Sequence, residues 1–181
     1  IFNLTNVLKE PHIKVIIPAF NEANSIGRVI ADIPKHVNEV IVVSNNSTDK
    51  TIAIAESAGA TVLEENQRGY GYACWKGLAY IKESLVKPDI IVFLDGDYSD
   101  YPEYLDAIVR PIIKCDVDLV IGARAKELRE DGSMTTPQIF GNWLATRLMK
   151  LFFKSRFTDL GPFRAIKYDT LLGLEMEDKT Y

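Results

Sequence analysis

Short apolar runs rich in β-branched residues alternate with helical patterns along the whole chain, and this alternation restricts the possible folds more than any other feature. Runs with the length and composition of strands occupy residues 14–17, 39–43, 60–63, 90–94 and 119–121. Strands that alternate with helices predict an α/β fold with a mainly parallel central sheet and flanking helices. The run at 90–94 is apolar throughout, so we expect it near the centre of that sheet.

Apolar residues recur at helical spacing between these runs. The first such stripe contains Ile26, Val29, Ile30 and Ile33. The next contains Cys74, Leu78, Ile81 and Leu85, and a third begins near Pro102 and contains Leu105, Ile108, Val109 and Ile112. Each stripe predicts a helix that packs one face on the sheet.

The size of the chain predicts one domain over residues 1–181. Because it begins with Ile1 and stops just after the charged stretch at 175–179, we expect a piece cut short at its C-terminus. A hydrophobic content of 47% and a charged content of 25% are typical of globular proteins. The net charge of −4, with no long Lys/Arg run, argues against nucleic acid as a partner. The sequence leaves the oligomeric state open.

The two cysteines, Cys74 and Cys115, stand far apart, and no signal peptide precedes the first predicted strand. We therefore predict a cytoplasmic protein with both thiols in its core. No apolar run approaches the roughly 20 residues that span a bilayer as a helix.

Polar residues follow every predicted strand. They occupy residues 18–22, 44–49, 66–68 and 95–100, and the last strand is followed by Arg124. Ligands of open α/β sheets bind beyond the carboxyl ends of the strands, so we expect these segments to form the binding site.

Asp95 and Asp97 are the most informative residues among them. Two carboxylates separated by Gly96 at a strand end can converge on a hard cation such as Mg²⁺ or Mn²⁺, which also bridges to substrate phosphates. The alternative is that the pair only caps the helix near Pro102. Arg124 could add positive charge for a leaving diphosphate, although an arginine alone is more often part of a surface ion pair.

Several other sites are excluded or disfavoured. Gly69 and Gly71 suggest a dinucleotide fingerprint, but Cys74 stands where the third glycine belongs, and no P-loop is present. A phosphohydrolase with an Asp-x-Asp nucleophile pair is disfavoured, because the pair follows the fourth strand without the usual Thr or Val after it.

The segment at about 138–153 predicts a helix that is apolar over much of its circumference and carries Arg147 and Lys150. Such a helix can dock peripherally on the inner face of an anionic membrane, or it can pack on its own domain. Both interpretations stay open.

The ordered set of motifs resembles family 2 glycosyltransferases with the GT-A (Rossmann-like) fold. It is most similar to the branch of dolichyl-phosphate mannose synthase and the bacterial polyprenyl-phosphate glycosyltransferases. The motifs lie at residues 15–22 (VIIPAFNE), 42–49 (VVSNNSTD), 93–97 (FLDGD), 122–124 (GAR) and 159–165 (DLGPFRA). They cover nearly the whole chain.

The resemblance implies roles for particular residues. Asp95 and Asp97 match the ligands of the metal and diphosphate, and Arg124 matches an arginine that contacts phosphate. The residues implied to bind the sugar nucleotide are Pro18, Phe20, Glu22, Val43, Asn45, Arg68 and Gly96, with Val43 and Asn45 at the base.

Two motifs depart from the family pattern. Ser44-Asn45-Asn46 stands where Asp-Asp-Gly is usual, which leaves the choice between uracil and guanine open. Gly161-Pro162-Phe163 replaces Ser-Gly-Phe, on the side where the acceptor is expected.

The resemblance implies an inverting, metal-dependent transfer of sugar from a UDP- or GDP-linked donor. No clear general base is present, so we expect a polyprenyl phosphate acceptor, whose oxygen is already ionised. The alternatives are a saccharide hydroxyl acceptor in polysaccharide synthesis and a noncatalytic sugar-nucleotide-binding domain.

Overall fold

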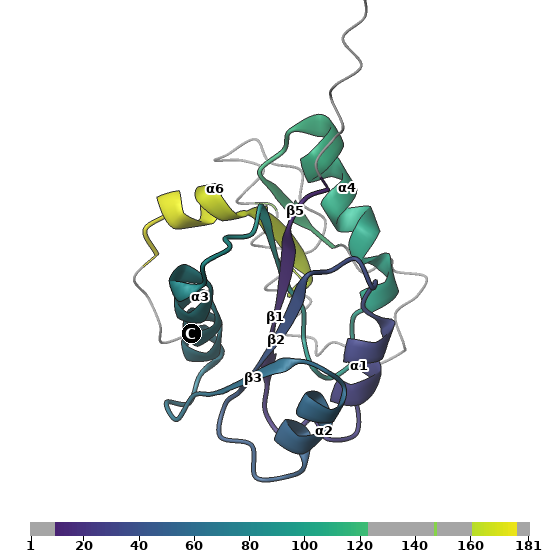
Figure 1. Ribbon diagram of the computed structural model, residues 1–181, viewed down its shortest axis with the longest axis vertical. Coiled ribbons are helices and arrows are strands. Elements are labelled where there is room, and N and C mark those ends of the chain that lie inside the picture. Colours follow the sequence, from purple (N-terminus) through teal and green to yellow (C-terminus); the bar gives the residue numbers. More distant parts are fainter. Residues whose placement is uncertain (1–9, 123–146, 148–160, 177–181) are drawn as a thin grey trace, which may run out of the picture.

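A six-stranded sheet forms the centre of the computed structural model, which describes residues 10–122, 147 and 161–176 (Figure 1). The strands are β1 (Ile13–Ala19), β2 (Glu39–Ser44), β3 (Thr61–Glu64), β4 (Ile90–Phe93), β5 (Leu119–Ile121) and β6 (Arg164–Lys167). Their order is β3-β2-β1-β4-β6-β5. The neighbouring strands β3, β2, β1 and β4 run parallel to one another, whereas β6 runs antiparallel to both β4 and β5. The predicted α/β class is confirmed.

Helices cover both faces of the sheet. They are α1 (Ile26–Asp32), α2 (Thr51–Ser57), α3 (Tyr70–Glu83), the 3₁₀ helix η1 (Pro102–Tyr104), α4 (Leu105–Cys115) and α6 (Tyr168–Gly173). Figure 1 shows α1, α2 and α4 on one face, with α3 and α6 on the other. In the described part of the chain, none of the helices combines the length and apolar character needed to cross a bilayer.

Two cores, one on each face, explain why the parallel strands read as continuous apolar runs. Along β1, Val15 and Ile17 enter the core under α1 and α4, and Ile16 enters the core under α3 and α6. Both faces of β4 are buried in the same way. A strand covered on both sides has no face exposed to solvent, so its sequence does not alternate between apolar and polar residues.

The prediction that Leu85 and Cys115 lie in the core is wrong. Leu85 lies beyond the end of α3 and is fully exposed, because Ser84 turns the backbone into an extended conformation after Glu83. Cys115 is exposed in the last turn of α4, where Asp116 leaves the helix in a left-handed conformation (φ 54°). Cys74 is half-buried, and both thiols are free.

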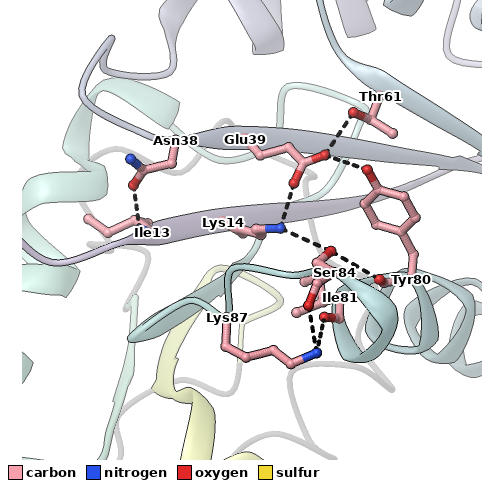
Figure 2. A network of polar contacts seen from close by, with 9 residues as sticks. All are labelled: Ile13, Lys14, Asn38, Glu39, Thr61, Tyr80, Ile81, Ser84 and Lys87. Atoms are coloured by element: carbon pink, nitrogen blue, oxygen red, sulfur yellow. Dashed lines mark hydrogen bonds and ion pairs between the residues drawn. The ribbon is translucent and has the colours of Figure 1, made fainter.

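A buried ion pair joins the amino ends of β1 and β2 (Figure 2). Lys14 and Glu39 are register neighbours, with Lys14 Nζ 2.7 Å from Glu39 Oε2. The side chain of Lys14 is 5% exposed and that of Glu39 is 22% exposed. Glu39 Oε1 also accepts hydrogen bonds from Thr61 Oγ1 (2.9 Å) and Tyr80 Oη (2.8 Å). Because Tyr80 lies on α3, this network ties the helix to the sheet.

The network also determines how Glu39 titrates. Burial alone would raise the pKa of Glu39, but hydrogen bonds from Lys14, Tyr80 and Thr61 outweigh burial, and the net pKa is lowered. A pocket of about 680 Å³ opens beside this network, at the opposite end of the strands from the predicted site. Its main polar groups bond to one another, so we assign it no ligand.

Candidate functional site

The loops after β1, β2, β3 and β4 meet at one edge of the sheet because these strands are parallel. Backbone hydrogen bonds join their ends, from Asn45 N to Ala19 O (2.8 Å) and from Glu65 N to Ser44 O (2.9 Å). These are the polar segments that the sequence places at the binding site.

Each of the four loops contains a residue with positive φ. These residues are Asn21 (58°), Asn46 (62°), Gly69 (141°) and Tyr98 (67°). Glycine adopts such angles at no steric cost, and asparagine tolerates the left-handed region better than most residues. Tyrosine does not, so Tyr98 is the outlier. Unfavourable backbone angles held by surrounding structure gather at functional sites.

Side-chain hydrogen bonds connect the first two loops. Asn21 N donates to Ser47 Oγ (3.1 Å), and Thr48 N donates to Asn21 Oδ1 (2.8 Å). Glu22 N donates to Thr51 Oγ1 (2.8 Å). These contacts fix the backbone beside the residues that are predicted to bind the nucleotide, and they do so in the absence of a ligand.

The residues predicted to bind the nucleotide differ in accessibility. Phe20 is 51% exposed, Arg68 is exposed and Pro18 is half-buried, so a ligand can reach all three. Val43 has no exposed surface, because it packs in the core under α3. Val43 is therefore not accessible to a base in this conformation.

The side chain of Asn45 is engaged by the loop that follows β3. Its Nδ2 donates to Glu65 O (3.1 Å) and Gln67 O (2.6 Å), and its Oδ1 accepts from Gly69 N (2.9 Å). Asn46 Nδ2 donates to the same loop. The predicted contact of Asn45 with a base stays a prediction, but in this structure its amide holds the loop at 65–69.

Asn45→Asp is expected to lower the free energy of unfolding by about 1–2 kcal/mol, because a carboxylate oxygen would face two carbonyl oxygens that have lost their donor. Chemical denaturation measures the loss, and hydrogen exchange of the Gly69 amide reports on the loop. Asn66→Asp is the matched control, since it introduces the same charge at an exposed side chain in the loop that Asn45 contacts. Equal stability of the two variants would contradict the role of Asn45.

The loop after β4 carries the predicted metal ligands. Asp95 is half-buried, Gly96 is buried and Asp97 is exposed. A Cβ atom at Gly96 would lie 3.3 Å from Glu22 Cγ, which is a tight contact, and 3.5 Å from Ala19 Cβ, so the backbone at this position closely approaches the loop after β1. The loop therefore packs directly on Glu22, one of the residues predicted to bind the nucleotide.

The helix-capping alternative for this pair is not observed. Neither η1 nor α4 has a side-chain cap, and their N-cap residues are Tyr101 and Tyr104. Asp97 Oδ1 instead accepts a hydrogen bond from Ser99 N (2.8 Å) within its own loop.

Two carboxylates at this edge fit a divalent cation whose shell is completed by other oxygens. Within residues 10–122, 147 and 161–176, no group of three His, Cys, Asp or Glu side chains could hold a metal ion alone. Mg²⁺ commonly binds through one or two carboxylates together with waters and substrate phosphates. Asp95 and Asp97 match that donor set.

Arg164 is a cation near this loop that the sequence reasoning did not assign to the site. Arg164 lies on β6 and is the register neighbour of Phe93 on β4. Phe93 comes two residues before Asp95. Both Arg164 and Asp95 are close enough to the Cys74 thiol to affect its pKa. Burial raises that pKa to about 12, Asp95 also raises it, and Arg164 lowers it. The position of Arg164 in the motif at 159–165 was the available signal. Arg124 and the helix at 138–153, apart from Arg147, lie outside the described residues.

Comparison with known proteins identifies relatives over most of the chain. Residues 14–171 match the sequence model described as Glycosyl transferase family 2. Glucosyl-3-phosphoglycerate synthase of Mycolicibacterium smegmatis is 33% identical over 135 residues, which are 67% of this chain and 43% of that protein. The low-salt glycan biosynthesis hexosyltransferase Agl6 of Haloferax volcanii is 30% identical over 155 residues, 82% of this chain and 36% of that protein.

A solved structure agrees with these matches. The structure of glucosyl-3-phosphoglycerate synthase from Mycobacterium tuberculosis in complex with Mn²⁺, UDP and glucosyl-3-phosphoglycerate has a TM-score of 0.70 and 25% identity. The alignment covers 90% of this chain and 58% of that one. The chain thus spans between 36% and 58% of the length of these three proteins. The likeness confirms the predicted GT-A sandwich.

Proposed function

Because this chain belongs to family 2 of the glycosyltransferases, we propose that it transfers a sugar from a nucleoside diphosphate sugar, with Asp95 and Asp97 binding Mg²⁺ or Mn²⁺. The main support for the proposal is the close packing of the Asp95-Gly96-Asp97 loop on Glu22. This packing brings two carboxylates beside the residues that are predicted to bind the nucleotide. In this arrangement one cation can contact the carboxylates and the diphosphate together.

A uridine nucleotide is the first donor to test. Structures of the mycobacterial synthase contain Mn²⁺ with UDP or with UDP-glucose. The amide of Asn45 faces the loop at 65–69, so in this conformation it is not available to read a base. We expect Phe20 and Arg68, which are exposed at the same edge, to contact the nucleotide.

The proposed reaction is a direct displacement with inversion at the anomeric carbon. An acceptor oxygen forms the new bond to that carbon as the bond to the diphosphate oxygen breaks, and the nucleoside diphosphate leaves with the electron pair. The metal, when bound, offsets the charge on the leaving diphosphate. Arg164, a cation on the strand that pairs with β4, can add to this stabilisation, and we propose that Arg124 contacts a phosphate.

We propose a polyprenyl phosphate as the acceptor. Its phosphate oxygen is ionised at neutral pH and attacks without a general base, and the sequence offers no clear base. The segment at 138–153 would then provide the peripheral membrane contact. A hydroxyl acceptor is the second candidate, because structures of the mycobacterial synthase contain phosphoglyceric acid beside UDP-glucose.

A thermal-shift screen with UDP and GDP sugars, each with and without Mn²⁺, tests the donor site. A ligand at 100 times its Kd adds about 2.7 kcal/mol of stability. For a chain of this size, that corresponds to a rise in Tm of about 5–10 °C. We expect this rise with a UDP sugar plus Mn²⁺, and a smaller one without the metal.

Transfer of labelled sugar then separates the acceptors. Polyprenyl phosphate in vesicles, phosphoglyceric acid and an oligosaccharide are offered in parallel. Binding without transfer to any acceptor would support a noncatalytic sugar-nucleotide-binding domain. No shift with any nucleotide would contradict the proposed function.

A further inference from the structure

Tyr98 has a backbone conformation that its side chain does not favour. Its φ of 67° lies in the left-handed region, where a bulky residue is a genuine outlier. Asn21 and Asn46 occupy the same region in neighbouring loops, but asparagine tolerates it. Surrounding contacts must therefore hold Tyr98 in place, and those contacts identify its role.

The contacts that hold Tyr98 come from α1. The phenol Oη donates a hydrogen bond to Asp32 Oδ2. The guanidinium carbon of Arg28 lies 4.2 Å from the centre of the ring, which is a cation–π geometry. The ring also packs on the core under α1 and α4. One helix, distant in sequence, thus holds both the ring and its hydroxyl.

The segment that leads into the same helix contacts the loop on the other side of Asp97. Gly96 packs on the side chain of Glu22. The carbonyl of Glu22 accepts hydrogen bonds from Ser25 N (3.1 Å) and Ile26 N (2.9 Å), at the start of α1. Asp97 therefore lies between Tyr98, which contacts α1, and Gly96, which contacts the segment joined to the start of α1.

From this arrangement we infer that Tyr98 is a positioning residue, anchored to Asp32 and Arg28, which sets the direction of the Asp97 carboxylate toward the metal and the diphosphate. The inference rests on the proposed function. Because Tyr98 follows Asp97 directly, a change in its φ would turn the peptide that joins them. Asp97 is exposed, and its side chain accepts a hydrogen bond from Ser99 in the same loop, so it can turn together with that loop.

Tyr98→Phe tests the anchor, since it removes the hydroxyl and keeps the ring over Arg28. We expect the Mn²⁺ concentration for half-maximal sugar transfer to rise about tenfold, the effect typical of losing an interaction that orients a metal ligand. At saturating Mn²⁺, kcat and the KM for the acceptor should stay near wild type. Asp32→Ala should have the same effect, and the double variant should be no worse than either single one.

Asp32→Asn is the matched control, because its amide oxygen still accepts the phenol hydrogen bond and the Mn²⁺ dependence should stay close to wild type. A readout independent of metal is hydrogen exchange of the Ser99 amide, which donates to Asp97 Oδ1 and should exchange faster in Tyr98→Phe.

Several results would overturn the inference. They are an unchanged Mn²⁺ dependence in Tyr98→Phe, additive effects of Tyr98→Phe and Asp32→Ala, and unchanged Ser99 exchange. A lowered Tm with unchanged Mn²⁺ dependence would reduce Tyr98 to a structural residue. Failure of the proposed function looks different, because the wild-type protein itself would then show no Mn²⁺-dependent binding of UDP.

Discussion

Asp97→Asn is expected to reduce sugar transfer about 1,000-fold, because it removes one of the two charges that we propose hold the metal against the diphosphate. The free energy of unfolding should change by less than about 0.5 kcal/mol, as is usual for exposed positions. The carboxylate of Asp97 is exposed, and its structural contact is the hydrogen bond from Ser99 N. Asparagine can accept that bond with its amide oxygen, so the loop should keep its shape.

Measuring transfer of labelled sugar over a range of Mn²⁺ concentrations checks this prediction, with denaturation as the test of folding. Asp106→Asn is a suitable control, since Asp106 is an exposed carboxylate paired with His36 (3.0 Å) and lies near His12 and Asn38, at the amino ends of the strands rather than at the candidate site. Its activity should equal that of the wild type. Near-normal transfer by Asp97→Asn would remove Asp97 from the metal site, and equal losses in both variants would point to a nonspecific effect of charge.

The sequence predicted the strands and helices well where burial is periodic or complete. β4 is a clear case, because both of its faces are covered and its run is wholly apolar. β6 was not predicted, since Arg164–Lys167 is short and begins and ends with a cation. It becomes a strand because it pairs with β4 and β5, and no local pattern encodes that pairing.

The location of the candidate site was also predictable, because parallel strands bring their carboxyl ends to one edge. The roles of individual side chains at that edge were less so. An asparagine after β2 can face a base or a neighbouring loop, and only the hydrogen bonds of Asn45 distinguish these arrangements. Tyr98 gave no signal, since backbone strain cannot be read from residue type.

At the other end of the strands, Glu39→Ala is expected to lower the free energy of unfolding by about 3 kcal/mol, at the low end of what breaking a buried ion pair costs. The low end applies because Glu39 is partly exposed, with 22% of its side chain accessible, whereas Lys14 is 5% accessible and would lose its counter-charge. The hydroxyls of Thr61 and Tyr80 would also lose their acceptor. For a chain of this size, Tm should fall by about 6–12 °C.

The pH dependence of the Glu39 variants identifies the charge as the cause. Because the pKa of Glu39 in the folded protein lies below its ordinary value of 4.5, its charge stabilises the fold fully above that value and less as the pH falls through the folded pKa. The stability difference between wild type and Glu39→Gln should therefore be present at pH 7 and shrink in acid. Lys14→Met combined with Glu39→Leu should recover the part of the loss that comes from the unpaired charge of Lys14, since an apolar pair leaves no buried charge. A difference that is independent of pH, or a double variant as unstable as Glu39→Ala, would show that packing and the hydrogen bonds of Thr61 and Tyr80, rather than charge, stabilise this end of the sheet.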